Sequence, residues 1–101
     1  MEDFLTLVPL ESPLTGFRLI GELDLSTAPR LKAALDGLPQ GSVTLDLAEL
    51  TFIDSSGLHA IMRFASSANG NGPLTLANPP AFVSRLLEII EMNSHPGMRI
   101  S

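Results

Sequence analysis

Residues 45–58 read LDLAELTFIDSSGL, and this stretch decides the fold. Leading into it, apolar residues alternate with polar ones, at Val43, Leu45 and Leu47, which is the period of a strand with one buried face. After the two serines the apolar spacing becomes i, i+3, i+4 and i+7, which is typical of a helix: Leu58, Ile61, Met62 and Ala65. The segment therefore predicts a strand over residues 43–47 and, beyond residues 48–53, a turn that opens a helix from about residue 56 to residue 68.

The residues before this unit predict two strands and a helix. Apolar runs at residues 4–8 and 17–21 are typical of short strands, and the proline and glycine between them indicate a turn over residues 11–16. Ser26 and Thr27 offer a helix N-cap, and Pro29 suits a first helical turn. We expect a helix over residues 27–38, ended by the glycines and proline that follow it.

The residues after the unit continue the alternation of strand and helix. Residues 69–72 read NGNG and predict a turn, and Leu74 and Leu76 alternate with polar or small neighbours in a further strand. Residues 78–80 open another helix, whose predicted core side is Phe82, Val83, Leu86, Leu87 and Ile90 and whose predicted water side is Ser84, Arg85, Glu88 and Glu91. A short last strand is expected near residues 98–101. The pattern predicts a single α/β domain over residues 1–101, with helices packed on a mixed sheet.

Composition limits the classes of function. The chain has 101 residues, 45% of them hydrophobic, and a formal net charge of −5. Its six basic residues are scattered, so it offers no basic patch for nucleic acid or for an anionic membrane. It has no cysteine, and we find no signal peptide or apolar run long enough to span a bilayer. We therefore expect a cytoplasmic location, with no nucleic-acid or membrane partner.

Ser55 and Ser56 stand where the second predicted helix begins, and two interpretations are open there. A serine at a helix N-cap commonly does no more than accept backbone N–H groups, which stabilises the helix by about 1 kcal/mol. The same place tolerates a phosphoryl group, because a helix N-terminus favours negative charge. A phosphate there carries about −1.5 to −2 charges, so it would disturb a partner surface fitted to a neutral hydroxyl.

Three stretches together resemble a known family: IGELDLSTAP (residues 20–29), LDL (45–47) and FIDSSGL (52–58). They resemble the STAS domain, named for sulfate transporters and anti-sigma factor antagonists, and most of all the free-standing bacterial antagonists. The resemblance covers almost the whole chain. It implies an α/β fold of STAS type, with a mixed sheet of four to five strands flanked by helices. The chain ends soon after Ile100, whereas relatives often continue into a further helix, which leaves the C-terminal packing open.

The resemblance also implies a function and its residues. In that family the unphosphorylated antagonist binds an anti-sigma factor, which is a serine kinase with a histidine-kinase-like ATPase fold, and so releases the sigma factor. The kinase inactivates the antagonist on the second serine of the motif, here Ser56, and a serine phosphatase reverses this. Asp24 and Asp54 match the family aspartates beside that serine and are expected to orient its hydroxyl and to contact the partner. The partner-binding residues implied or expected are Asp24, Asp54, Ser55, Ser56, Gly57, His59 and Arg63. Phe64 is either the edge of this surface or peripheral core.

Other classes of function have weaker support. Ser56, His59 and Asp54 are close in sequence but lack the Gly-x-Ser-x-Gly elbow of a hydrolase, so we expect no enzyme. Two isolated histidines and dispersed carboxylates give no metal spacing, and no phosphate-binding glycine pattern is present. We expect no cofactor, and any nucleotide belongs to the partner. The alternative is a non-switching STAS interaction subunit of a larger stress-signalling or lipid-transport assembly.

Overall fold

The computed structural model describes residues 4–39, 41–66, 74–89 and 97–101. Over these residues the chain forms five strands and three helices, which follow one another along the chain as β1 (Leu5–Pro9), β2 (Gly16–Leu23), α1 (Ala28–Asp36), β3 (Val43–Ile53), α2 (Ser55–Ala65), β4 (Leu74–Ala77), α3 (Ala81–Ile89) and β5 (Met98–Ile100). This order confirms the predicted α/β fold, including the short strand at the end of the chain.

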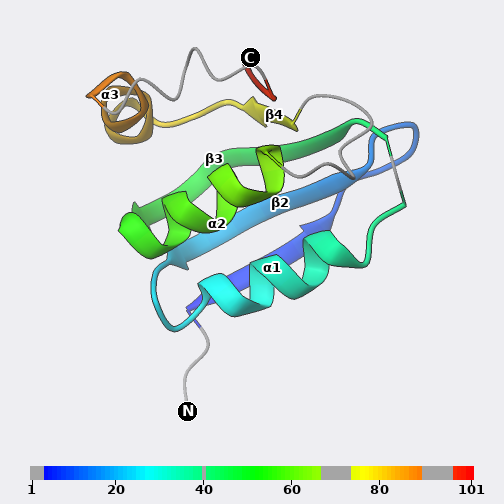
Figure 1. The fold of residues 1–101 in the computed structure, drawn as a ribbon, viewed down its shortest axis with the longest axis horizontal. Coiled ribbons are helices and arrows are strands. Elements are labelled where there is room, and N and C mark those ends of the chain that lie inside the picture. The colour runs from blue at the N-terminus through cyan, green and yellow to red at the C-terminus, as the bar shows by residue number, and fades with distance from the viewer. Residues whose placement is uncertain (1–3, 40, 67–73, 90–96) are drawn as a thin grey trace.

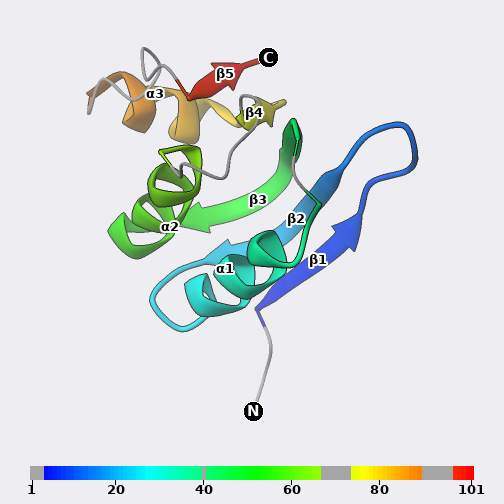
Figure 2. The same cartoon turned by 45° about the vertical axis from the view of Figure 1, so that its right-hand side comes forward.

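The strands form a single mixed sheet whose spatial order is the same as the sequence order. β1 pairs antiparallel with β2, and the remaining neighbours are parallel. α1 and α2 lie together on one side of the sheet, each connecting two neighbouring parallel strands (Figures 1 and 2). The carboxyl ends of β2 and β3 therefore meet at one edge of the sheet.

The core lies between the sheet and the helices and is built mostly from leucine. Leu19 and Leu45 of the sheet are fully buried, as is Leu31 of α1, and Ile61 of α2 is almost so. Each such side chain contributes roughly 1.5–3 kcal/mol by leaving water. Among the described helices, none is long and apolar enough to cross a membrane.

β3 is longer than the alternation of its residues predicts. It runs over Val43–Ile53, whereas the period-2 pattern ends at Leu47, because Ala48 and Glu49 are both exposed. The pairing with β2 shifts register twice, between Arg18 and Ile20 and again between Gly21 and Glu22. Each shift adds a residue to β3, which breaks the alternation without ending the strand.

The helices also differ from the prediction in detail. α1 ends at Asp36 and α2 covers Ser55–Ala65, so both are shorter than expected. Phe82 of α3 was predicted to face the core and is 43% exposed. The reason is that α3 buries the stripe of Val83 and Leu87, and Phe82 precedes that stripe. The predicted turn at 69–72 and the predicted sides of Ile90 and Glu91 lie outside the described residues.

Candidate functional site

Asp24 and Asp54 lie at the same edge of the sheet because each follows the last residue of one of two adjacent parallel strands. Leu23 and Ile53 are register partners at the ends of β2 and β3. The backbone N–H of Asp54 donates to the carbonyl of Leu23 over 3.1 Å, which keeps the pairing intact up to the turn. The structure thus brings together the two aspartates that the motifs place about 30 residues apart.

Asp54 is the N-cap of α2. Its backbone is extended, and its Oδ1 accepts hydrogen bonds from the N–H groups of Ser56 (2.8 Å) and Gly57 (3.1 Å). Its Oδ2 accepts from the N–H of Leu25 over 3.2 Å. One carboxylate therefore holds both the first turn of α2 and the loop between β2 and α1.

The interpretation of the two serines as caps is wrong. Ser55 is the first residue of α2 and Ser56 the second, and the side chain that accepts the orphan N–H groups is that of Asp54. Within the described residues neither serine hydroxyl forms a hydrogen bond with the protein. Ser55 is exposed and Ser56 is half-buried. The helix start is complete without either hydroxyl.

Asp24 organises the loop that precedes α1. Its Oδ1 accepts hydrogen bonds from the N–H groups of Ser26 (2.9 Å) and Thr27 (3.1 Å). The Thr27 hydroxyl points back into the loop, where it donates to the carbonyl of Glu22 over 2.9 Å and accepts from the N–H of Asp24 over 2.9 Å. Thr27 occupies the N-cap position of α1 but makes no cap with its side chain, which corrects the predicted role of Ser26 and Thr27.

Gly57 lets the first turn of α2 approach the end of β2. A Cβ at this position would lie 2.6 Å from Cγ of Leu23 and 2.9 Å from its carbonyl oxygen. Gly57 is buried, so its contribution to the site is the placement of the neighbouring Ser56.

The outer side of α2 carries Ser55, His59 and Arg63, which are all exposed and recur every four residues along the helix. Phe64 is half-buried and packs against the hydrophobic core. Of its two interpretations, the structure therefore supports peripheral core. His95, the second of the two isolated histidines, lies outside the described residues.

Comparison with known proteins identifies the family. The family model described as "Mlab, STAS domain" matches residues 14–99. The chain belongs to the STAS domain family. Among solved structures, the unphosphorylated anti-sigma factor antagonist SpoIIAA is 21% identical, with a TM-score of 0.65 over 96% of this chain and 86% of that one. An anti-sigma factor antagonist from Mycobacterium paratuberculosis is 18% identical, with a TM-score of 0.72 over 94% and 85%. No curated protein sequence matches significantly.

Leu25 is a residue of this STAS domain that the sequence interpretation missed. It is 74% exposed, although the backbone N–H groups of its loop donate hydrogen bonds to the side chains of both aspartates. Its N–H group and that of Ser56 share the Asp54 carboxylate, so Leu25 is a close neighbour of Ser56. The available signal was an apolar residue between Asp24 and Ser26, in a loop of otherwise polar residues.

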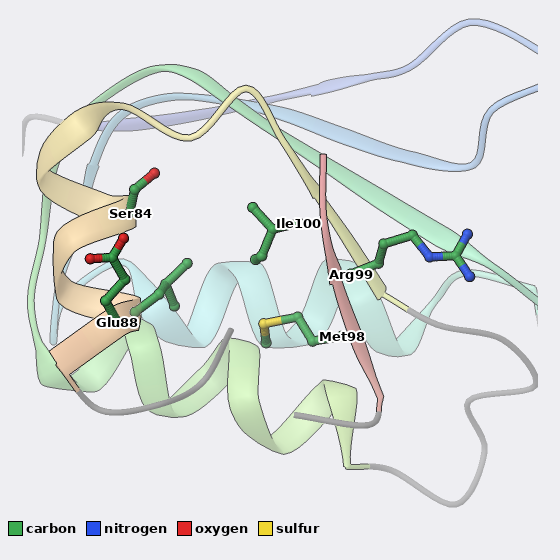
Figure 3. Close-up of a pocket in the computed structure, with 6 residues that line it drawn as sticks. Ser84, Glu88, Met98, Arg99 and Ile100 are labelled. Atoms are coloured by element: carbon green, nitrogen blue, oxygen red, sulfur yellow. The ribbon is translucent and has the colours of Figure 1, made fainter. Parts of the chain in front are cut away.

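Two further features of the STAS domain bear on chemistry. Within the described residues, no hydrogen bond joins Asp54 to His59 or His59 to Ser56; the Asp54 oxygens accept from the backbone N–H groups of Leu25, Ser56 and Gly57. These three residues therefore form no relay of the serine-hydrolase type. A separate cavity of about 490 Å³ lies between α3 and β5 (Figure 3), and none of the predicted site residues lines it.

Replacing Asp54 tests its structural role. Asp54→Ala removes the cap of α2 and the acceptor for Leu25, so we expect the free energy of unfolding to fall by about 1–2 kcal/mol. Asp54→Asn keeps an oxygen that can accept from Ser56 and should cost clearly less. Urea denaturation followed by circular dichroism measures both variants. Equal stabilities for the two variants would show that the cap contributes nothing through its acceptor oxygen.

Proposed function

We propose that this STAS domain is an anti-sigma factor antagonist that binds a serine-kinase anti-sigma factor and is inactivated by phosphorylation of Ser56. A serine phosphatase would restore binding, and the ATP needed by the kinase places the pair in the cytoplasm. The observation that carries the proposal is that the side chain of Asp54, and not that of Ser56, caps the start of α2. Asp54 supplies the cap, and no hydrogen bond among the described residues uses the Ser56 hydroxyl, which leaves it available for modification.

Electrostatics explains how a phosphate on Ser56 would act. The N-terminus of α2 favours negative charge, so the domain itself should tolerate the phosphate. The group would nevertheless add about −1.5 to −2 charges beside Asp54, and close to Asp24, in a chain that is already acidic. A partner that docks on this edge would meet both electrostatic repulsion and the cost of removing water from a dianion.

The proposed partner surface surrounds Ser56. Asp24, Ser55, His59 and Arg63 supply its polar part, Gly57 and Asp54 hold it in shape, and Leu25 supplies an exposed apolar contact. Burying one leucine contributes roughly 1.5–3 kcal/mol, provided that the surrounding surfaces fit closely. A phosphate next to Leu25 would prevent that close fit.

Mapping the phosphate tests the proposal. We expect that incubation with ATP and a histidine-kinase-like anti-sigma factor from the same organism places one phosphate on Ser56, as read by tandem mass spectrometry. Ser55→Ala should still be phosphorylated, whereas Ser56→Ala should not. Ser55 is the matched control because it is the adjacent serine and the more exposed of the two. A phosphate found on Ser55 would overturn the assignment to Ser56.

A second candidate is a STAS subunit that binds its partners without switching, in a larger stress-signalling or lipid-transport assembly. The match of residues 14–99 to the family model described as "Mlab, STAS domain" is the observation that favours this candidate. The two candidates differ in one measurable property. A non-switching subunit binds its partner equally well with and without a negative charge at position 56.

A further inference from the structure

A row of three side chains crosses the side of the sheet that lies away from α1 and α2. Glu22 of β2 pairs with Phe52 of β3, and the N–H of Glu22 donates to the carbonyl of Phe4 over 2.7 Å. Successive side chains of a strand alternate between its faces, and the neighbours of this row, Leu5, Leu23 and Ile53, are buried on the helix side. Phe4, Glu22 and Phe52 therefore share the open side, which we call the Phe4–Glu22–Phe52 row.

Both aromatic residues of this row are accessible to a partner. Phe4 is 51% exposed and Phe52 is 47% exposed, whereas Glu22 between them is half-buried. Neighbouring strands are about 4.8 Å apart, so the backbones that carry the two phenyl rings are separated by about 10 Å. That spacing leaves room for one flat group above Glu22.

The carboxylate in the middle of the row has no cation within the described part of the chain. No ion pair involves Glu22 there. Arg18, which precedes it on β2, is 3.6 Å from Asp46 and 3.8 Å from Glu49. A negative charge flanked by two exposed phenyl rings is thus left available to an external cation.

We propose that the Phe4–Glu22–Phe52 row binds an arginine side chain of a partner protein. A guanidinium group is flat, stacks on aromatic faces and donates two parallel hydrogen bonds to a carboxylate, so it complements all three residues at once. A lysine ammonium is more strongly hydrated and presents no flat face to the rings. An acidic group would be repelled by Glu22, and a neutral apolar group would bury the carboxylate without a partner.

This binding site goes beyond the proposed switch. Ser56 lies on α2, which packs on the other side of the sheet. Glu22 and Phe52 lie on the open side, and each precedes one of the site aspartates by two residues. An arginine held there would leave the outer side of α2 uncovered. The inference does not depend on phosphorylation, and its test needs no kinase.

A peptide titration tests the inference. The probe is N-acetyl-Gly-Arg-Gly amide, added to isotope-labelled protein and followed by NMR through the ring resonances of Phe4 and Phe52. We expect these resonances to shift and to saturate in the millimolar range. The same peptide with citrulline, which has the shape of arginine without its charge, should cause no saturable shift. Glu22→Gln should weaken the arginine peptide about threefold or more, as expected for an exposed ion pair.

A charge-matched variant separates the row from the general acidity of the chain. Glu11→Gln removes one exposed carboxylate outside the row and should leave the affinity unchanged. Amide spectra of each variant show whether it is folded. Equal binding of the citrulline peptide, equal weakening by Glu11→Gln and Glu22→Gln, or unshifted ring resonances at the solubility limit of the arginine peptide would each overturn the proposal.

Discussion

Ser56→Asp is expected to fold normally and to bind the anti-sigma kinase more than a hundredfold more weakly than the unmodified domain. The fold should persist because Asp54, and not the serine, caps α2, and because a helix N-terminus favours a negative charge. Binding should fail because the added carboxylate stands beside Asp54 and Leu25, on the surface that the kinase must cover. A loss of roughly 3 kcal/mol in binding free energy corresponds to that change in affinity.

Isothermal titration calorimetry with the kinase in its nucleotide-bound form measures this effect. Ser56→Ala should keep its affinity, since no hydrogen bond of the fold uses that hydroxyl within the described residues. Ser55→Asp is the comparison variant: it adds the same charge one residue earlier, on the outer side of the helix, and is expected to weaken binding less than Ser56→Asp. If Ser56→Asp and Ser56→Ala bind the kinase equally well, the switch is excluded and the non-switching candidate gains support.

Gly57→Ala is expected to lower the free energy of unfolding by roughly 2–3 kcal/mol, as an overpacked core does. The new methyl group would lie 2.6 Å from Cγ of Leu23 and 2.9 Å from the carbonyl oxygen of the same residue. Leu23 is fully buried at the end of β2, so α2 must move outward to relieve the contact. Because Ser56 precedes this residue, the same movement should also reduce kinase affinity.

Gly37→Ala is the matched control for this substitution. Gly37 has an ordinary φ of −85°, and a Cβ there would have no neighbour closer than 3.6 Å. The control should change stability by less than about 1 kcal/mol, because alanine also restricts the unfolded chain. Thermal and urea unfolding of both variants gives the comparison. Equal stability of Gly57→Ala and Gly37→Ala would mean that the helix has room at position 57.

The order of strands and helices was predictable from sequence because each element carries its own period or its own turn residues. The unit from β3 to α2 shows the limit of such a prediction. The alternation of β3 ends at Leu47, yet the strand continues to Ile53, because its pairing with β2 resumes after each of the two extra residues in β3. Register shifts depend on the neighbouring strand, and a pattern read along one segment does not contain them.

The site was predictable in its location and only partly in its chemistry. The motif places Asp54, Ser55 and Ser56 at a helix start, but all three are good capping residues, and sequence alone does not rank them. The choice of Asp54 follows from its extended backbone and from the N–H of Leu25, which arrives from another part of the chain. The exposure of Leu25 and the Phe4–Glu22–Phe52 row depend likewise on tertiary structure and on strand pairing.

The shared acceptor at Asp54 couples two segments at the edge of the sheet. The backbone N–H groups of Leu25, Ser56 and Gly57 all donate hydrogen bonds to the Asp54 carboxylate. A rotation of that side chain would break three hydrogen bonds at once, in two segments that are about 30 residues apart in the chain. A displacement of either segment therefore alters the hydrogen bonds of the other.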